Sequence, residues 1–276
     1  MCMFSGKVDR VSNTRIFARG ANGRQYLVYG MAYKSKKELA MVLPLPVPQP
    51  CAEDEIEFYN MKDYPTFFTD MKKAFPTQIT AYMSRSAGSK SLSERTLVVH
   101  EVGDYEASFV PGMSDFDRLD ERFRIPQDIW QKLPDYQDYG FAVFKLKPTT
   151  AKTWAGNVSK SFKNNSQSFR EVHPMAFTFP RRNPDMLYFP TIHVHKGNLP
   201  AEAFFDHTLF CQPDDTTKDY LDDWESSLGP LGQFLDVSKT RGIVDGEQFG
   251  WQLHLQGKYR NQDTWCGHNK SVPTRI

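Results

Sequence analysis

Histidine and cysteine side chains recur at even spacing in two apolar runs of the chain's last third. His193 and His195 lie two residues apart in the first run, and His207 and Cys211 lie four apart in the second. Successive side chains of a strand alternate between its faces, so each run would present its His and Cys residues on one face. A hairpin would bring the two sets together as nitrogen and sulfur ligands, which zinc, copper and non-haem iron prefer. The predicted metal ligands on a hairpin over 193–211 are therefore His193, His195, His207 and Cys211.

The coordination number decides what such a metal would do. An open position would let it activate water for hydrolysis or bind an oxygen substrate, whereas four protein ligands would make the site structural. The expected cofactor is a divalent transition metal, zinc or iron, and the expected partner is a small-molecule substrate or another protein. Asp206 is a candidate for orienting a neighbouring imidazole. The alternative is that these histidines and Cys211 are ordinary residues of packed strands.

Cys2 offers a different chemistry at the N-terminus. Removal of the initiator Met would leave a thiol nucleophile and an α-amino base in one residue, as in N-terminal-nucleophile amidohydrolases. In the cysteine enzymes of that group, an Arg and an Asp on the first hairpin bind substrate. Arg15 and Arg19 are candidates for the Arg, whereas Asn22 occupies the turn where the Asp would stand. The sequence thus leaves Cys2 and Arg15 as catalytic candidates, beside the alternative that Cys2 has no special role.

Composition limits the classes of partner. The 34 basic and 33 acidic residues nearly cancel, which gives no electrostatic footprint for nucleic acid or a membrane surface. No apolar run reaches the length of a membrane span, and no signal peptide is recognisable, so we expect a cytoplasmic protein with free thiols. Aromatic residues make up 14% of the chain, which leaves a third hypothesis, a non-catalytic binding or scaffold protein with exposed aromatics.

Short apolar runs between turn signals indicate a fold built mainly on strands. Asn22-Gly23, between two such runs, is a strong signal for a hairpin. The expected strands are 14–19, 25–33, 39–46, 96–102, 103–110, 139–146, 173–180, 187–195, 204–212 and 250–257. The expected helices are 64–75, 126–133 and 214–228, with a short helix or turn at 116–119. The predicted class is α+β, a mostly antiparallel β-sheet with three or four short covering helices.

A polar stretch over 147–168 marks the expected boundary between two parts of the chain. Residues 1–150 would form a β-rich N-terminal half, and 169–276 a C-terminal α+β half that carries the His-bearing hairpin. The alternative is one continuous domain.

Several stretches in the first two thirds are similar to those of an uncharacterised bacterial family. They are Cys2-Met-Phe, Thr14-Arg-Ile-Phe-Ala, Tyr29-Gly-Met-Ala-Tyr, Leu39-Ala-Met-Val-Leu-Pro-Leu-Pro46, Glu101-Val-Gly-Asp-Tyr-Glu-Ala107 and His173-Pro-Met-Ala-Phe-Thr-Phe-Pro180. On these stretches the chain resembles the family called domain of unknown function 2330. The resemblance implies one continuous fold for residues 1 to about 180, and it implies no activity.

Overall fold

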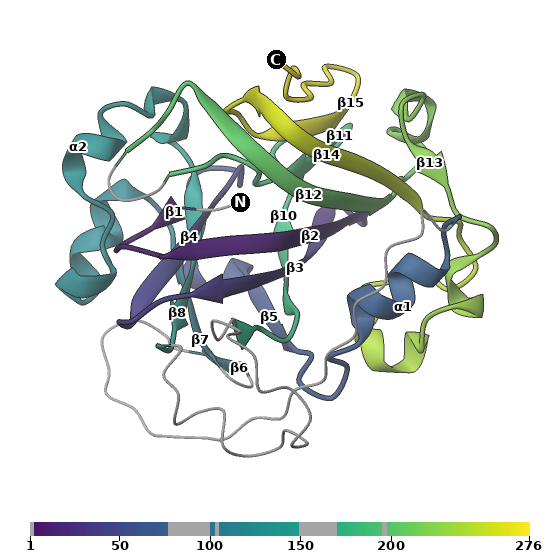
Figure 1. Ribbon diagram of the computed structural model, residues 1–276, viewed down its shortest axis with the longest axis horizontal. Helices are drawn as coiled ribbons and strands as arrows, with labels where there is room; N and C mark the ends of the chain where they lie inside the picture. Colours follow the sequence, from purple (N-terminus) through teal and green to yellow (C-terminus); the bar gives the residue numbers. More distant parts are fainter. Residues whose placement is uncertain (1–2, 77–99, 103–104, 149–169, 195–197) are drawn as a thin grey trace, which may run out of the picture.

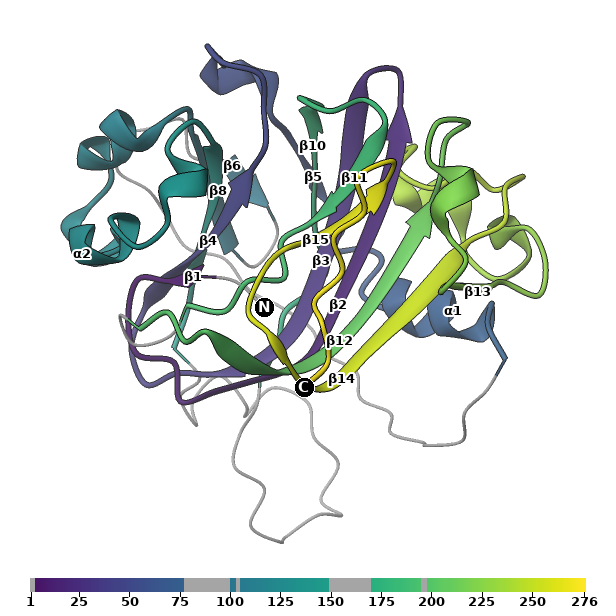
Figure 2. The same ribbon diagram turned by 90° about the horizontal axis from the view of Figure 1, so that it is seen from above.

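Two β-sheets face each other across the largest apolar core, and short helices cover their outer surfaces (Figures 1 and 2). The computed structural model describes residues 3–76, 100–102, 105–148, 170–194 and 198–276. All sheet pairings between named strands in these ranges are antiparallel except one, that of β2 with β12. The predicted α+β class is confirmed. No helix in the described ranges has the length and apolar character needed to cross a membrane.

The larger sheet has eight strands in the order β13–β14–β12–β2–β3–β10–β5, with β9 also pairing with β3. Their bounds are β2 (Arg10–Ala21), β3 (Arg24–Lys34), β5 (Glu57–Asn60), β9 (Arg170–Glu171), β10 (Met175–Pro180), β12 (Glu202–Gln212), β13 (Glu225–Ser226) and β14 (Trp251–Arg260). The sheet therefore combines strands from both expected halves of the chain. The two central strands, β2 and β12, come from opposite sides of the expected boundary.

The smaller sheets complete the β structure. The five-stranded sheet has the order β1–β4–β8–β7–β6, and a third sheet pairs β11 with β15. The bounds are β1 (Met3–Phe4), β4 (Leu39–Leu45), β6 (His100–Val102), β7 (Tyr105–Val110), β8 (Gly140–Leu146), β11 (Met186–Phe189) and β15 (Thr264–Gly267). Every residue of β4 is buried, as its continuous apolar run predicts.

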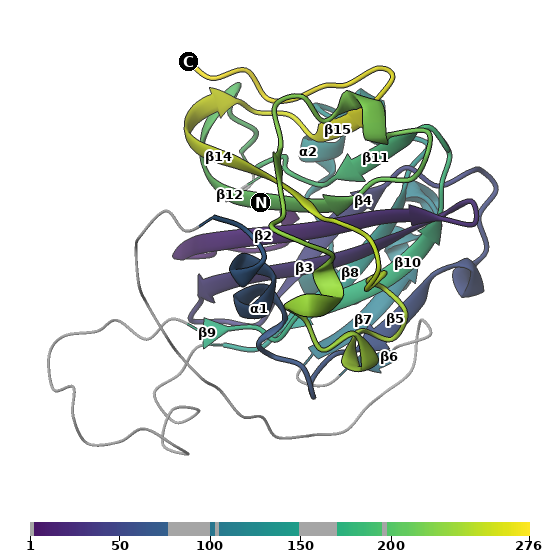
Figure 3. The same cartoon turned by 90° about the vertical axis from the view of Figure 1, so that its right-hand side faces the viewer.

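The helices are short. The α-helices are α1 (Phe67–Lys73) and α2 (Gln127–Trp130), and the 3-10 helices are η1 (Glu53–Glu55), η2 (Met113–Arg118), η3 (Glu121–Phe123), η4 (Pro134–Tyr136), η6 (Lys218–Tyr220), η7 (Leu231–Gln233) and η8 (Val237–Thr240). Figure 2 shows α2 and its neighbours outside the five-stranded sheet, and Figure 3 shows α1 over β2 and β3. Each outer layer has its own apolar cluster, so both sheets are covered on two faces.

The β2–β3 hairpin forms where the sequence predicts it. Asn22 and Gly23 have φ angles of 52° and 71°, the left-handed conformation that tight two-residue hairpin turns require. Residues 24–34 return antiparallel to β2, and β10 then pairs with the other edge of β3.

Two expectations for the C-terminal part are wrong. The hairpin between 187–195 and 204–212 does not form, because β11 pairs with β15 while β12 pairs with β14 and β2. The helix expected over 214–228 is reduced to η6, because Trp224 packs against Phe189 and Glu225 pairs with β14. In both cases a partner distant in sequence replaces the local one.

Candidate functional site

The candidate site lies where the central strands β2 and β12 separate. Their parallel pairing runs from Thr14 opposite His207 to Arg19 opposite Gln212. N-terminal to Thr14, the register of β2 on β3 shifts between Ser12 and Arg15, and Asn13 has a φ of 55°. Such a bulge bends its strand and raises the local twist. As a result, β2 turns away from β12 and the sheet opens.

The carboxylate of Asp206 bridges this opening. Its Oδ2 accepts a hydrogen bond from the backbone N–H of Asn13 at 2.9 Å, and its Oδ1 accepts one from the side-chain amide of Gln256 at 3.2 Å. A side chain of β12 thus satisfies a donor of β2 that the backbone of β12 no longer reaches. The bridge fixes the point at which the strands separate.

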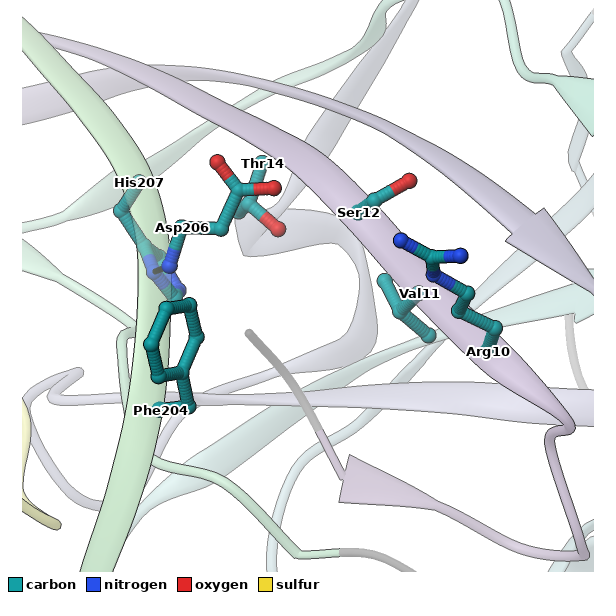
Figure 4. Close-up of a pocket in the computed structure, with 7 residues that line it drawn as sticks. All are labelled: Arg10, Val11, Ser12, Thr14, Phe204, Asp206 and His207. Atoms are coloured by element: carbon teal, nitrogen blue, oxygen red, sulfur yellow. Dashed lines mark hydrogen bonds between the residues drawn. The ribbon is translucent and has the colours of Figure 1, made fainter. Parts of the chain in front are cut away.

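A pocket of about 160 Å³ occupies the opening (Figure 4). It is lined by Arg10, Val11, Ser12 and Thr14 of β2 and by Phe204, Asp206 and His207 of β12. This volume is roughly that of a cavity known to hold a benzene ring, about 150 Å³. Phe204 is 70% exposed, an unusual position for a large aromatic side chain on a central strand. The pocket has room for one ring-sized group.

His207 forms the buried wall of the pocket. Its side chain is almost fully buried, and its ring Nδ1 accepts a hydrogen bond from the backbone N–H of Asp206 at 3.1 Å. Burial lowers the pKa of His207 well below its usual value, and the neighbouring His193 acts in the same direction. The ring is therefore neutral at pH 7, and because Nδ1 accepts, its proton is on Nε2. His207 therefore contributes a neutral imidazole ring to the buried wall of the pocket.

His193 lies beside His207 although the two do not share a hairpin. The two ring centroids are 5.2 Å apart, and the ring of Phe205 stacks on His193 at 4.5 Å. The side chain of Asn261 holds this segment by accepting from the backbone N–H of His193 at 2.7 Å and donating to its carbonyl oxygen at 2.9 Å. These side-chain hydrogen bonds replace those that a strand ladder would supply.

Asp263 holds the residues that precede His193. Its buried carboxylate accepts from the backbone N–H groups of Thr191 at 2.7 Å and Ile192 at 2.8 Å, and from the hydroxyls of Tyr136 and Tyr188 at 2.5 and 2.6 Å. Burial raises the pKa of Asp263, while these four donors act to lower it. The position of His193 thus depends on Asn261 and Asp263, two polar residues of the C-terminal tail whose role the sequence does not reveal.

The four predicted metal ligands are not all in one place. His193 and His207 meet, whereas Cys211 lies fully buried in the core, four residues or about 13 Å further along β12. Burial raises the pKa of Cys211, so its thiol is protonated at neutral pH. His195 lies outside the described residues. In the described ranges, no group of three His, Cys, Asp or Glu residues is arranged to hold a metal ion.

The predicted catalytic residues are placed only in part. Cys2 lies outside the described residues, so its hypothesis stays a prediction. Arg15 is buried, with its guanidinium 5.1 Å from the centre of the Phe68 ring of α1. Since neighbouring residues of a strand face opposite ways, Arg15 lies on the face of β2 opposite to Thr14, and it is not among the residues that line the pocket.

Ser12, Asp206 and His207 all line the pocket, but they do not form a catalytic triad. Such a triad needs a base nitrogen that accepts the serine proton and a carboxylate bonded to the other ring nitrogen. Here Nδ1 of His207 accepts from the backbone and Nε2 carries the proton, while the Asp206 carboxylate binds Asn13 and Gln256. These three residues are therefore not arranged as a catalytic triad.

The sequence interpretation missed Arg10 and Ser12, because it began the first strand at residue 14. It placed Phe204 on the expected strand 204–212 but gave it no role in a site. The structure begins β2 at Arg10. The polar pair Ser12-Asn13, next to an otherwise apolar strand, was the available signal for a bulge.

Comparisons with known proteins do not identify a family for this chain. No family model and no curated protein matches the chain, so the resemblance to domain of unknown function 2330 stays a prediction. A solved structure, the crystal structure of baculovirus P35, is 12% identical, with coverage of 96% of this chain and 99% of that chain and a TM-score of 0.43. The candidate site is therefore defined by its own geometry.

Proposed function

We propose that the protein is a non-catalytic binding protein that takes a ring-sized ligand, or a side chain of a partner, into the opening between β2 and β12. The observation that carries this proposal is the pocket itself, of about 160 Å³, opened by the Asn13 bulge between two central strands. Bulges of this kind are typical of functional sites, where they redirect side chains.

The chemistry of the walls supports binding. Arg10, Ser12 and Thr14 bring polar groups on one side, and Phe204 brings an exposed apolar ring on the other. Sites for small ligands combine apolar walls with a few polar groups that fix orientation.

A screen of single-ring compounds by NMR tests this proposal. At least one compound should shift the backbone amide signals of Thr14 and His207. Replacing Ser12 by Phe fills the pocket and should abolish those shifts. Ser238→Phe, a change of the same kind at an exposed residue of η8, should preserve them. The proposal fails if no compound shifts these amides, or if the shifts survive Ser12→Phe.

A second candidate function is metal binding at the histidine pair. The 5.2 Å separation of the His193 and His207 rings and the neutral state of His207 support it, with His195 as the predicted third ligand. The hydrogen bond that His207 accepts at Nδ1 weighs against it, since a neutral imidazole bound to metal through Nε2 carries its proton on Nδ1.

Elemental analysis of the purified protein, beside a His193→Ala/His195→Ala variant, tests the metal hypothesis. Near-stoichiometric zinc or iron that disappears in the variant would support it. Protein that contains no metal, and whose thermal stability does not change on adding zinc or iron, would reject it. We also propose a cytoplasmic location, which the free thiols of Cys51, Cys211 and Cys266 support.

A further inference from the structure

We infer that the ligand of the opening between β2 and β12 is an aromatic ring that carries a positively charged amine. This inference rests on the proposed binding function and names the class of ligand. It follows from Phe204 and Asp206, which both line the pocket (Figure 4). The two residues are two positions apart on β12, so their side chains lie on the same face of the strand. One wall of the opening thus presents an aromatic ring next to a carboxylate.

The carboxylate of Asp206 has hydrogen-bonding capacity left for a ligand. An ionised carboxylate can accept about four hydrogen bonds. Here it accepts two, from the backbone N–H of Asn13 at 2.9 Å and from the side-chain amide of Gln256 at 3.2 Å. Both donors are neutral, and among the residues that the structure describes Asp206 takes part in no ion pair. An ammonium group of a ligand would fill the remaining acceptor sites and balance the charge.

The cations of the surrounding strands leave this carboxylate open to a ligand. Lys258 lies opposite Phe204 on β14, and its ammonium forms an ion pair with Glu202 instead. Arg10 precedes Asn13 by three residues, or about 10 Å along β2. Figure 4 shows its guanidinium at the end of the pocket away from this carboxylate. Since about 10 Å is close to the screening length in salt, Arg10 does not prevent an amine from binding there.

The exposed ring of Phe204 selects the rest of the ligand. Phe204 is 70% exposed, so a ligand ring packed against it would bury apolar surface on both partners. Val11 supplies an apolar side chain from β2. The volume of about 160 Å³ admits one ring and leaves little space for a second. The face of an aromatic ring also attracts a nearby cation, so Phe204 and Asp206 favour the same charge on the ligand.

Three probes of similar shape and different charge test the inference: 2-phenylethylamine, 2-phenylethanol and phenylacetate. Isothermal titration on the full chain should show the amine binding roughly tenfold more tightly than the alcohol, and the acid more weakly than either. Asp206→Asn keeps an acceptor oxygen for the N–H of Asn13 but removes the charge, so the amine and the alcohol should bind it about equally. Asp128→Asn, the same change at an exposed residue of α2, should preserve the preference for the amine.

The possible results separate this inference from the proposed function. Equal binding of amine and alcohol by the unmodified protein, or an unchanged preference in Asp206→Asn, would overturn the inference and leave the proposed binding function standing. Tightest binding of the acid would overturn it in favour of an anionic ligand. Binding of none of the three would reject both. A fourth probe, phenylalanylglycinamide, separates two sources of the same group, because tighter binding than 2-phenylethylamine would indicate the N-terminus of a peptide rather than a free aromatic amine.

Discussion

Removal of the Asp263 carboxylate should destabilise the protein and free the segment that holds His193. Four buried donors, two tyrosine hydroxyls and two backbone N–H groups, point at this carboxylate over distances of 2.5 to 2.8 Å. A buried donor left without an acceptor costs about 1–3 kcal/mol. At the low end of that range, Asp263→Ala should lower the free energy of unfolding by about 4 kcal/mol, a large part of the total for a typical domain.

Asp263→Asn is the matched control. The amide keeps an acceptor oxygen for the N–H groups of Thr191 and Ile192, and the tyrosine hydroxyls can turn to accept from its nitrogen. We therefore expect a smaller loss, about 1–2 kcal/mol, which reports the charge rather than the lost contacts.

Urea unfolding measures the loss of stability in Asp263→Ala and in Asp263→Asn, and hydrogen exchange shows which backbone amides become less protected. In Asp263→Ala, the amides of Thr191 and Ile192, which donate directly to the carboxylate, should exchange faster than those of the β2–β3 hairpin. A loss below about 1 kcal/mol with unchanged protection of these two amides would refute the reasoning. If the Ala variant does not fold, the same comparison is made on the Asn variant.

Further predictions concern pH, packing and the exposed ring. Because the folded pKa of His207 lies below the usual 6.5, unfolding takes up a proton below that pH, and the free energy of unfolding should fall there by up to about 1.4 kcal/mol per pH unit. Urea titrations should show this slope flattened in His207→Gln, and an identical slope would contradict the assignment. A Cβ at Gly20 would clash with the guanidinium of Arg181, which forms a partly buried ion pair with Asp214, so thermal unfolding of Gly20→Ala should reveal a loss of roughly 3 kcal/mol. A Cβ at Gly23 would meet no atom within 4 Å, so Gly23→Ala should lose only about 1 kcal/mol of stability, from its positive φ. Equal losses in Gly20→Ala and Gly23→Ala would argue against the clash at Gly20. Phe204→Ser should change the free energy of unfolding by less than about 0.5 kcal/mol and yet abolish binding of single-ring compounds. A large loss of stability would instead show that the Phe204 ring packs against the rest of the protein.

Interactions between residues close in sequence made much of the structure of the N-terminal half predictable. The alternation of apolar residues and the Asn22-Gly23 turn specify the β2–β3 hairpin, because turn geometry and strand twist are set by adjacent residues. The apolar run of β4 predicts its complete burial for a similar reason, since no polar residue offers it an exposed face.

The prediction of a helix over 214–228 was wrong because contacts with residues distant in sequence replaced the local helical hydrogen bonds. Asp214 accepts a hydrogen bond from the backbone N–H of Thr216 at 3.2 Å, as a helix cap would. Burial alone would raise the pKa of Asp214, but hydrogen bonds from the Thr216 and Thr217 hydroxyls and the Arg181 ion pair outweigh it and lower that pKa. The chain beyond it still leaves the helical path, because Trp224 finds a buried place against Phe189. Capping residues indicate where a helix can begin, but packing decides whether it continues.

By itself the sequence determined the class of fold, most strands and the presence of chemically capable residues near position 200. Only the tertiary structure decided which of them meet. His193 and His207 lie together because Asn261 and Asp263 hold a non-strand segment against β12, and Cys211 is apart because a strand extends about 3.3 Å per residue. The pocket exists because β2 pairs with a strand nearly two hundred residues away and then bends from it at one extra residue. Such long-range pairings leave no mark in local sequence, so the site could be found only once the strands were placed.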